Sequence, residues 1–78
     1  MYCVYLLKTK NKSIYTGSTR DIRKRYIKHK KGSVLATKGL RPLKLIFYCV
    51  FPTKNKALRF EKYLKSGSGQ AFRNKRLK

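Results

Sequence analysis

A single glutamate in an otherwise cationic chain is the first residue that could do chemistry here. Glu61 and Asp21 are the two acidic residues, against twenty-two Lys and Arg, and the formal charge is +20 over 78 residues. Clustered Lys and Arg bind polyanions because they displace the counterions condensed on phosphate. A carboxylate weakens that attraction, so its presence at Glu61 indicates a specific use. We predict that it holds a divalent cation beside a phosphodiester.

Arg25 and His29 form a second candidate pair. The S-x-x-D spacing that ends at Asp21 is typical of a capping box, which predicts a helix over residues 19–31 that ends at Gly32. Helical spacing places Arg25 and His29 one turn apart on a common face. An imidazole with an ordinary pKa of about 6.5 suits proton abstraction near neutrality. The capping box also assigns Asp21 to a helix start.

Two tyrosines are the remaining candidates. Residues 2–7 and 13–16 are rich in aromatic and β-branched side chains, which predicts two strands joined by a hairpin turn. If the turn centres on Lys10, Tyr5 falls opposite Tyr15. The two phenols would then lie side by side on one face of the sheet.

The rest of the chain predicts the elements that complete this scaffold. The segment 43–51, apolar except for Lys44, predicts the central, most buried strand, reached through a loop over residues 32–42. Thr53 can cap a second helix that runs through residue 65 and carries Glu61 on its apolar stripe. The apolar stripe of this second helix consists of Ala57, Phe60, Glu61 and Leu64. Residues 70–78 predict a short final helix.

Length and composition predict one α+β domain over residues 1–78, with a small three-stranded mixed or antiparallel sheet flanked by helices. The element order is strand, strand, helix, strand, helix, helix. At 41% hydrophobic the chain is too apolar for a disordered basic tail, and no apolar stretch approaches the roughly 18 residues of a membrane span. The N-terminal apolar run is also too short for a signal peptide, so we expect a cytoplasmic, nucleoid-associated protein. Cys3 and Cys49 lack the spacing of a zinc site, which favours reduced thiols over a disulfide between adjacent strands.

Taken in chain order, these residues resemble a known family. The sequence contains, in order, Val4-Tyr5, Tyr15-Thr16-Gly17, Asp21-Ile22-x-x-Arg25-x-x-x-His29, Arg41-Pro42 and Ala57-x-x-x-Glu61-Lys62. This order resembles the GIY-YIG endonuclease domain, in particular small stand-alone members similar to the nuclease domain of the excision-repair incision subunit. The resemblance covers residues 2–77. The sequence departs from the family pattern in two places. Of the first motif, Gly-Ile-Tyr, only Tyr5 is retained, and in the second, Tyr-Ile-Gly, Thr16 replaces the isoleucine.

The resemblance implies a phosphodiesterase with one metal ion, Mg²⁺ or Mn²⁺, bound by Glu61. Arg25 would clamp the scissile phosphate and stabilise charge in the transition state. Tyr15 matches the tyrosine often assigned as general base, and Tyr5 would orient the water or its partner tyrosine. Gly17 would let the backbone approach the nucleic acid closely.

Other positions carried over from the family concern contacts with nucleic acid. Ser18 stands where many members have a phosphate-binding Lys, Arg41 precedes the third strand, and Asn74 lies near the asparagine that often completes the site. For the general base, His29 remains an alternative to Tyr15, because its unperturbed pKa needs less adjustment.

Two functions from different classes fit the sequence. The first is a metal-dependent DNA endonuclease that acts by water attack, in DNA repair, recombination or mobile-element processing. The second is a noncatalytic basic module that binds nucleic acid, as small ribosomal proteins do. Glu61 favours the first, since simple binding gains nothing from a carboxylate among phosphates. Recruitment by a partner protein is compatible with both.

Overall fold

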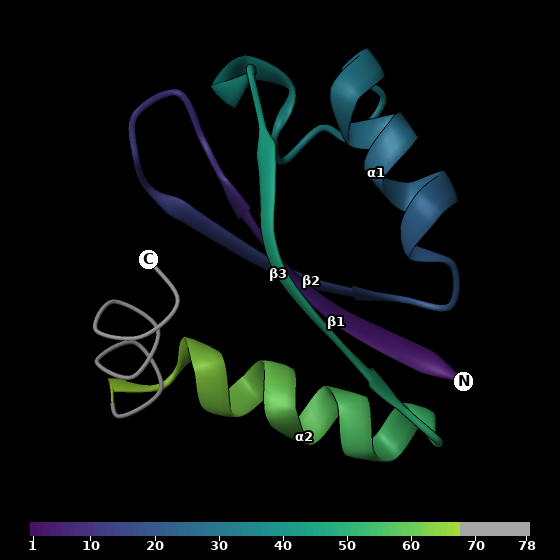
Figure 1. Ribbon diagram of the computed structural model, residues 1–78. Helices are drawn as coiled ribbons and strands as arrows, with labels where there is room; N and C mark the ends of the chain where they lie inside the picture. The colour runs from purple at the N-terminus through teal and green to yellow at the C-terminus, as the bar shows by residue number, and fades with distance from the viewer. Residues whose placement is uncertain (68–78) are drawn as a thin grey trace.

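The fold is arranged around its first strand, which is buried on both faces. In the computed structural model, which describes residues 1–67, the strands form an antiparallel sheet in the order β2-β1-β3. Figure 1 shows helices α1 and α2 on opposite sides of this sheet. The elements are β1 (Tyr2–Lys8), β2 (Ile14–Thr19), α1 (Ile22–Lys31), the 3₁₀ helix η1 (Lys38–Leu40), β3 (Lys44–Phe51) and α2 (Lys54–Lys65).

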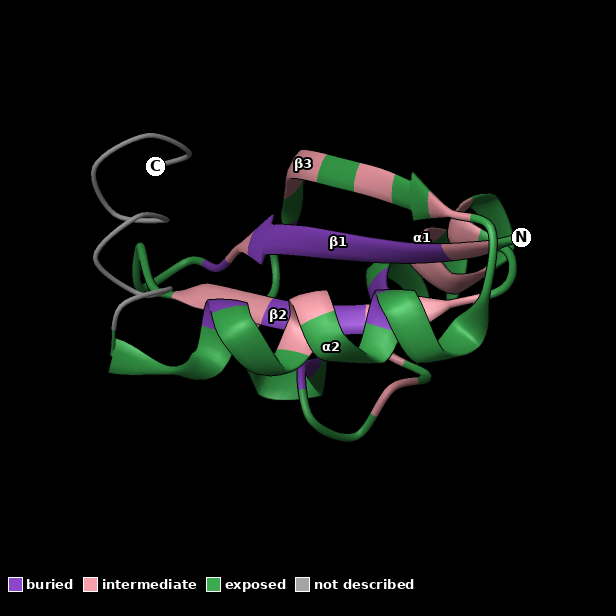
Figure 2. Ribbon diagram, turned by 90° about the horizontal axis from the view of Figure 1, so that it is seen from below, coloured by how far each residue is buried: buried purple, intermediate pink, exposed green. Residues whose placement is uncertain are grey.

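Alternate side chains of β1 enter two separate cores, because successive residues of a strand point to opposite faces. Val4 and Leu6 pack on α2, together with Ala57 and Leu64 of that helix. Tyr5 and Leu7 face the other way, and the residues that pack there include Ile22 and Tyr26 of α1. Figure 2 shows β1 as buried along most of its length, and α2 as largely exposed with short buried and intermediate stretches.

The prediction that the segment 43–51 is the central strand is wrong. The central strand is β1, and β3 lies at one edge of the sheet. Tyr48 and Val50 are 55% and 48% exposed, so one face of β3 is only partly covered. An unbroken apolar run does not distinguish the two strands, because residues 3–7 form such a run as well. Their positions are set by the order of pairing.

Helix α1 begins three residues later than predicted. Asp21 is itself the N-cap, and its side chain accepts a hydrogen bond from the backbone N–H of Lys24 at 3.1 Å. Thr19 therefore belongs to β2, and its hydroxyl accepts from the Asp21 N–H at 3.2 Å. The end of the helix is as predicted, since Gly32 adopts the left-handed conformation with φ of 79°. The structural role predicted for Asp21 is confirmed at a different cap position.

The hairpin turn is shifted by one residue, which moves the strand pairing by two. Tyr5 pairs with Gly17, and Tyr15 pairs with Leu7, so the predicted Tyr5–Tyr15 pair is wrong. The turn is closed by the Thr9 N–H, which donates to the Ser13 carbonyl at 3.0 Å. Because side chains alternate with a period of two, this shift keeps both tyrosines on the same face.

The second strand extends to Thr19, beyond the predicted range 13–16, and the predicted loop 32–42 contains η1. Thr53 caps α2 by accepting from the Lys56 N–H at 3.2 Å. Cys3 and Cys49 are free thiols. The predicted final helix and Asn74 lie outside the described residues. No helix within residues 1–67 has the length and apolar character needed to cross a membrane.

Candidate active site

The two motif tyrosines and the motif glycine form one packed group on the α1 face of the sheet. Tyr5 is 1% exposed, and its ring lies over Gly17 on the neighbouring strand. The ring centroids of Tyr5 and Tyr15 are 6.4 Å apart, and Tyr15 is half-buried. A Cβ atom at Gly17 would stand 2.5 Å from the Tyr5 hydroxyl oxygen. The position therefore has to be glycine if Tyr5 is to keep its place.

His29 joins this group from α1 and is fully buried. Its Nε2 lies 2.8 Å from the Tyr5 hydroxyl oxygen, and its Nδ1 lies 2.7 Å from the hydroxyl oxygen of Thr37. The imidazole also meets the Tyr15 ring edge-on, at 5.3 Å between centroids. Burial lowers the pKa of His29, and the nearby positive charge of Arg25 lowers it further. His29 is therefore neutral at physiological pH.

Arg25 lies one helical turn before His29 and is half-buried beside the tyrosines. The pKa of Arg25 is raised, first by the neighbouring Tyr5 phenol, which favours the charged guanidinium against the opposing effect of burial. The Nε atom of Arg25 is buried and has no hydrogen-bond partner in the part of the chain that the structure describes. Buried donors are nearly always satisfied, so this atom is in place for an acceptor from a bound molecule.

An open surface hollow adjoins Arg25 and is lined mainly by cations. It lies where β2 passes into α1, and its size suits a small anionic group. The residues around it are Thr19, Arg20, Asp21, Lys24, Arg25 and Lys28. Asp21 is committed to the helix cap there, so the hollow presents mostly positive charge. The positive charge of this surface can attract the phosphates of a polyanion and bring them close to Arg25.

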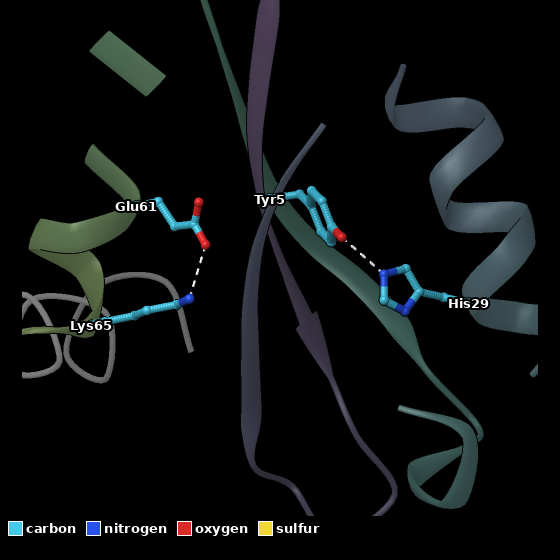
Figure 3. Close-up of polar contacts among 4 residues, drawn as sticks. All are labelled: Tyr5, His29, Glu61 and Lys65. Carbon is cyan, nitrogen blue, oxygen red and sulfur yellow. Dashed lines mark hydrogen bonds and ion pairs between the residues drawn. The ribbon is translucent and has the colours of Figure 1, made fainter. Parts of the chain in front are cut away.

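Glu61 lies apart from the group of Tyr5, Tyr15, Arg25 and His29. It is on α2, at the opposite face of the sheet. Figure 3 shows Tyr5 pointing from the sheet toward His29, while Glu61 and Lys65 lie on the other side. The Glu61 carboxylate accepts from Lys65 Nζ at 2.9 Å, and its side chain is 16% exposed. The pKa of Tyr5 is raised, and burial is the largest cause. Arg25 lowers this pKa in opposition, and the negative charge of Glu61 adds a smaller increase. The carboxylate is thus within electrostatic range of the tyrosine.

The donor set around Glu61 restricts which metal site could form. Among residues 1–67 there is no group of three His, Cys, Asp or Glu side chains that could enclose an ion. Magnesium does not need such a cage, because it commonly keeps several waters and binds one or two carboxylates plus substrate phosphate. A single carboxylate with an exposed lysine as its partner fits that mode of binding. It does not fit a structural zinc site.

The same arrangement of motifs is found in a family of nuclease domains. The sequence profile of the GIY-YIG catalytic domain matches residues 1–76 of the chain. The chain belongs to the GIY-YIG family. The family is a nuclease superfamily, so nucleic acid is the general class of substrate that it implies.

Relatives of this GIY-YIG chain are small proteins of similar length. It is 43% identical over 68 residues to a UPF0213 protein of Staphylococcus saprophyticus, covering 86% of this chain and 83% of the relative. A UPF0213 protein of Clostridium perfringens is 39% identical over 66 residues, covering 83% of this chain and 71% of the relative. The solution NMR structure of a UPF0213 protein from Bacillus halodurans superposes with a TM-score of 0.60 at 34% identity. That match covers 96% of this chain and 84% of the other, and it confirms the predicted fold.

The structure brings together four of the five residues that the GIY-YIG resemblance proposed as catalytic. Tyr5, Tyr15, Arg25 and His29 meet on the α1 face, and Glu61 lies on the α2 side. Their catalytic roles stay predictions.

The predicted nucleic-acid contacts are scattered over this GIY-YIG domain. Ser18 pairs with Val4 and so shares its α2-facing side of the sheet. Arg41 donates to the carbonyls of Lys38 and Lys30, at 3.1 and 3.3 Å, which gives it a structural role at the end of α1. Contacts of Ser18 and Arg41 with nucleic acid stay predictions.

Sequence reasoning missed Thr37 as a partner of His29, because the contact depends on the path of a loop. It also missed the cations of the hollow. The spacing of Lys24 and Lys28 on one helix face, next to Arg25, was the signal that could have found them.

Proposed function

We propose that this GIY-YIG chain is a metal-dependent endonuclease that hydrolyses phosphodiester bonds of DNA by water attack. The observation that carries the proposal is the buried Arg25 Nε, which has no partner among the described residues and lies beside two tyrosines and a cationic hollow. A phosphate oxygen is the acceptor that would satisfy it, and a guanidinium binds phosphate through charge-assisted hydrogen bonds. The same contact would strengthen as charge develops on the phosphorus oxygens.

The substrate would lie across the edge of β2. That strand is an outer strand of the sheet, with α1 on one face and α2 on the other. A phosphodiester at Gly17 would meet Arg25 from the α1 side and Glu61 from the α2 side. Glu61 would hold Mg²⁺ or Mn²⁺, and the bound ion would supply Lewis-acid stabilisation of the phosphate oxygens. Lys65 would release the carboxylate at that point, which costs little because its side chain is 56% exposed.

For the proton of the attacking water we favour Tyr15 as the acceptor. His29 is completely buried, and both of its ring nitrogens are engaged, by Tyr5 and Thr37. It therefore cannot take a proton directly from a water molecule, and acts through Tyr5 instead. Tyr15 is half-buried, so a water can reach its hydroxyl.

The experiment is cleavage of supercoiled plasmid, single-stranded DNA and a structured RNA by the purified protein. We expect nicking of DNA with Mg²⁺ or Mn²⁺, and none with EDTA. The Arg25→Ala variant, purified in the same way, should bind DNA but not cut it. If the wild-type protein binds all three polymers and cuts none of them with either metal, the chain is the noncatalytic binding module instead. Preferred cutting of the RNA would overturn DNA as the substrate.

Two further properties are part of the same proposal. We propose a cytoplasmic, nucleoid-associated location, because DNA is the proposed substrate. We also propose that a partner protein recruits this small domain to its site of action.

A further inference from the structure

Three polar side chains form a hydrogen-bonded chain through the interior on the α1 face. Tyr5 Oη lies 2.8 Å from His29 Nε2, and His29 Nδ1 lies 2.7 Å from Thr37 Oγ1. Their side chains are almost completely removed from solvent, at 1%, 0% and 0% exposure. A buried chain of this kind has a direction, because every bond in it needs one donor and one acceptor.

Thr37 is placed for this contact by its own loop. It stands at the N-cap position of η1, yet its side chain makes no capping bond. The loop is held instead by backbone bonds, from the Thr37 N–H to the Val34 carbonyl and from the Leu40 N–H to the Thr37 carbonyl. The hydroxyl is therefore left free to serve His29.

Counting protons decides between the two directions. Neutral His29 carries one N–H, and Thr37 and Tyr5 each carry one O–H, so two hydrogen bonds use two of three protons. If His29 donated to Thr37, the Thr37 proton would be left over. In this fully buried position, no second hydrogen bond of the Thr37 hydroxyl is found within residues 1–67. If Thr37 donates, the proton left over belongs to Tyr5.

The Tyr5 end is the better place for an unused proton. The Tyr5 oxygen lies next to Arg25 and Tyr15, on the side where the proposed substrate approaches. A phosphate oxygen of the proposed substrate would accept the Tyr5 proton there. The positive charge of Arg25 also lies close to the Tyr5 oxygen and favours its use as an acceptor.

We propose that Thr37 is a positioning residue, which donates to Nδ1 and so holds His29 in the tautomer protonated at Nε2, where the imidazole donates to the Tyr5 oxygen. His29 then donates to that oxygen, beside the positive charge of Arg25. The catalytic meaning of this arrangement rests on the proposed function, but the tautomer does not.

The groups that face the imidazole are few enough for a clear experiment. They are Tyr5 of β1, Tyr15 of β2, Arg25 of α1 and Thr37 of the loop, with Glu61 of α2 acting at longer range through Tyr5. His29 is the one histidine of the sequence. Selective ¹⁵N labelling of histidine therefore gives one pair of ring-nitrogen signals, which report the tautomer directly.

The test compares the wild-type protein with Thr37→Ser and Thr37→Val at pH 8, where His29 is neutral. In the wild type and in Thr37→Ser we expect protonation at Nε2, with Nδ1 in the range of an unprotonated ring nitrogen. In Thr37→Val, which keeps the shape but removes the hydroxyl, we expect a mixture of both tautomers. DNA cleavage by Thr37→Val should fall at least about tenfold with unchanged DNA binding, while Thr37→Ser should cleave at about the rate of the wild-type protein.

Protonation of the wild-type protein at Nδ1 would overturn the proposal, and this result needs no variant. An unchanged tautomer in folded Thr37→Val would overturn it as well, because another group would then set the tautomer. If Thr37→Val does not fold, the wild-type and Thr37→Ser spectra still decide. If the wild-type protein fails to cut DNA at all, the proposed function fails while the Nε2 signal still tests the role of Thr37.

Discussion

The Tyr5 hydroxyl lies directly over Gly17, in the space that any other side chain would fill. A Cβ at Gly17 would stand 2.5 Å from Oη and 2.6 Å from Cζ of Tyr5. The tyrosine of the first motif and the glycine of the second are thus one packing unit across the β1–β2 ladder. The glycine is required by its neighbouring strand, and this packing aims Tyr5 at His29.

Replacing Gly17 by Ala should displace Tyr5 from His29. We expect a loss of stability of about 1–3 kcal/mol, which is the usual cost of overpacking, together with loss of DNA cleavage. The matched control is Gly39→Ala, because a Cβ at Gly39 meets no atom within 4 Å. Urea unfolding and plasmid nicking measure the two effects. Equal behaviour of the two variants would show that Tyr5 does not depend on the glycine.

Replacing Arg25 by Lys keeps the charge but removes the Nε donor and the planar fork. If Arg25 clamps a phosphate in the transition state, cleavage should fall by about 10²–10³-fold with little change in DNA affinity. Arg23 is an exposed arginine of the same helix and provides the control, Arg23→Lys. Cleavage rates under single-turnover conditions decide the matter. A fully active Arg25→Lys protein would reduce this residue to a simple point charge.

Sequence patterns predicted what depends on neighbours along the chain and missed what depends on long-range pairing. The end of α1 at Gly32 and the cap of α2 at Thr53 follow from local chemistry, and both were found. The place of β3 at the sheet edge and the pairing of Tyr5 with Gly17 depend on strand order and turn length, and both were missed. In the candidate site, helical spacing found Arg25 and His29.

Some site features had no local signal at all. The contact between His29 and Thr37 depends on how the loop folds back over α1, and the α2-side position of Glu61 depends on packing of the whole helix. The resemblance predicted that Glu61 belongs to the site. It did not indicate that Glu61 and Arg25 lie on opposite faces of the sheet.

The stability of the protein should fall on mild acidification. The pKa of His29 is lowered by burial, so below about pH 6.5 the unfolded chain takes up a proton that the folded protein resists. The free energy of unfolding should be level above pH 6.5 and decrease below it, by at most about 1.4 kcal/mol per pH unit. His29 is the one histidine of the sequence, and the ordinary pKa of histidine places this window near pH 6.5. Urea unfolding at pH 5.5, 6.5 and 7.5 measures it, and a rise in stability on acidification would contradict burial of a neutral imidazole.

Lys65 should weaken metal binding at Glu61, because a cation has to displace its ammonium group from the carboxylate. We expect Lys65→Ala to bind Mn²⁺ up to about fivefold more tightly, in line with the modest strength of exposed ion pairs. Lys62→Ala removes the same charge from the same helix and serves as the control. Electron paramagnetic resonance titration of free Mn²⁺ gives both affinities. Weaker binding in Lys65→Ala than in Lys62→Ala would place the metal elsewhere.

The most direct measurement for the central claim is DNA cleavage by Glu61→Gln compared with Asp21→Asn. Each variant removes one negative charge, and asparagine at position 21 can still cap α1. If Glu61 holds the catalytic metal, Glu61→Gln should bind DNA normally and lose cleavage by roughly a thousandfold, while Asp21→Asn stays active. Cleavage by Glu61→Gln at the rate of the wild-type protein would contradict the account.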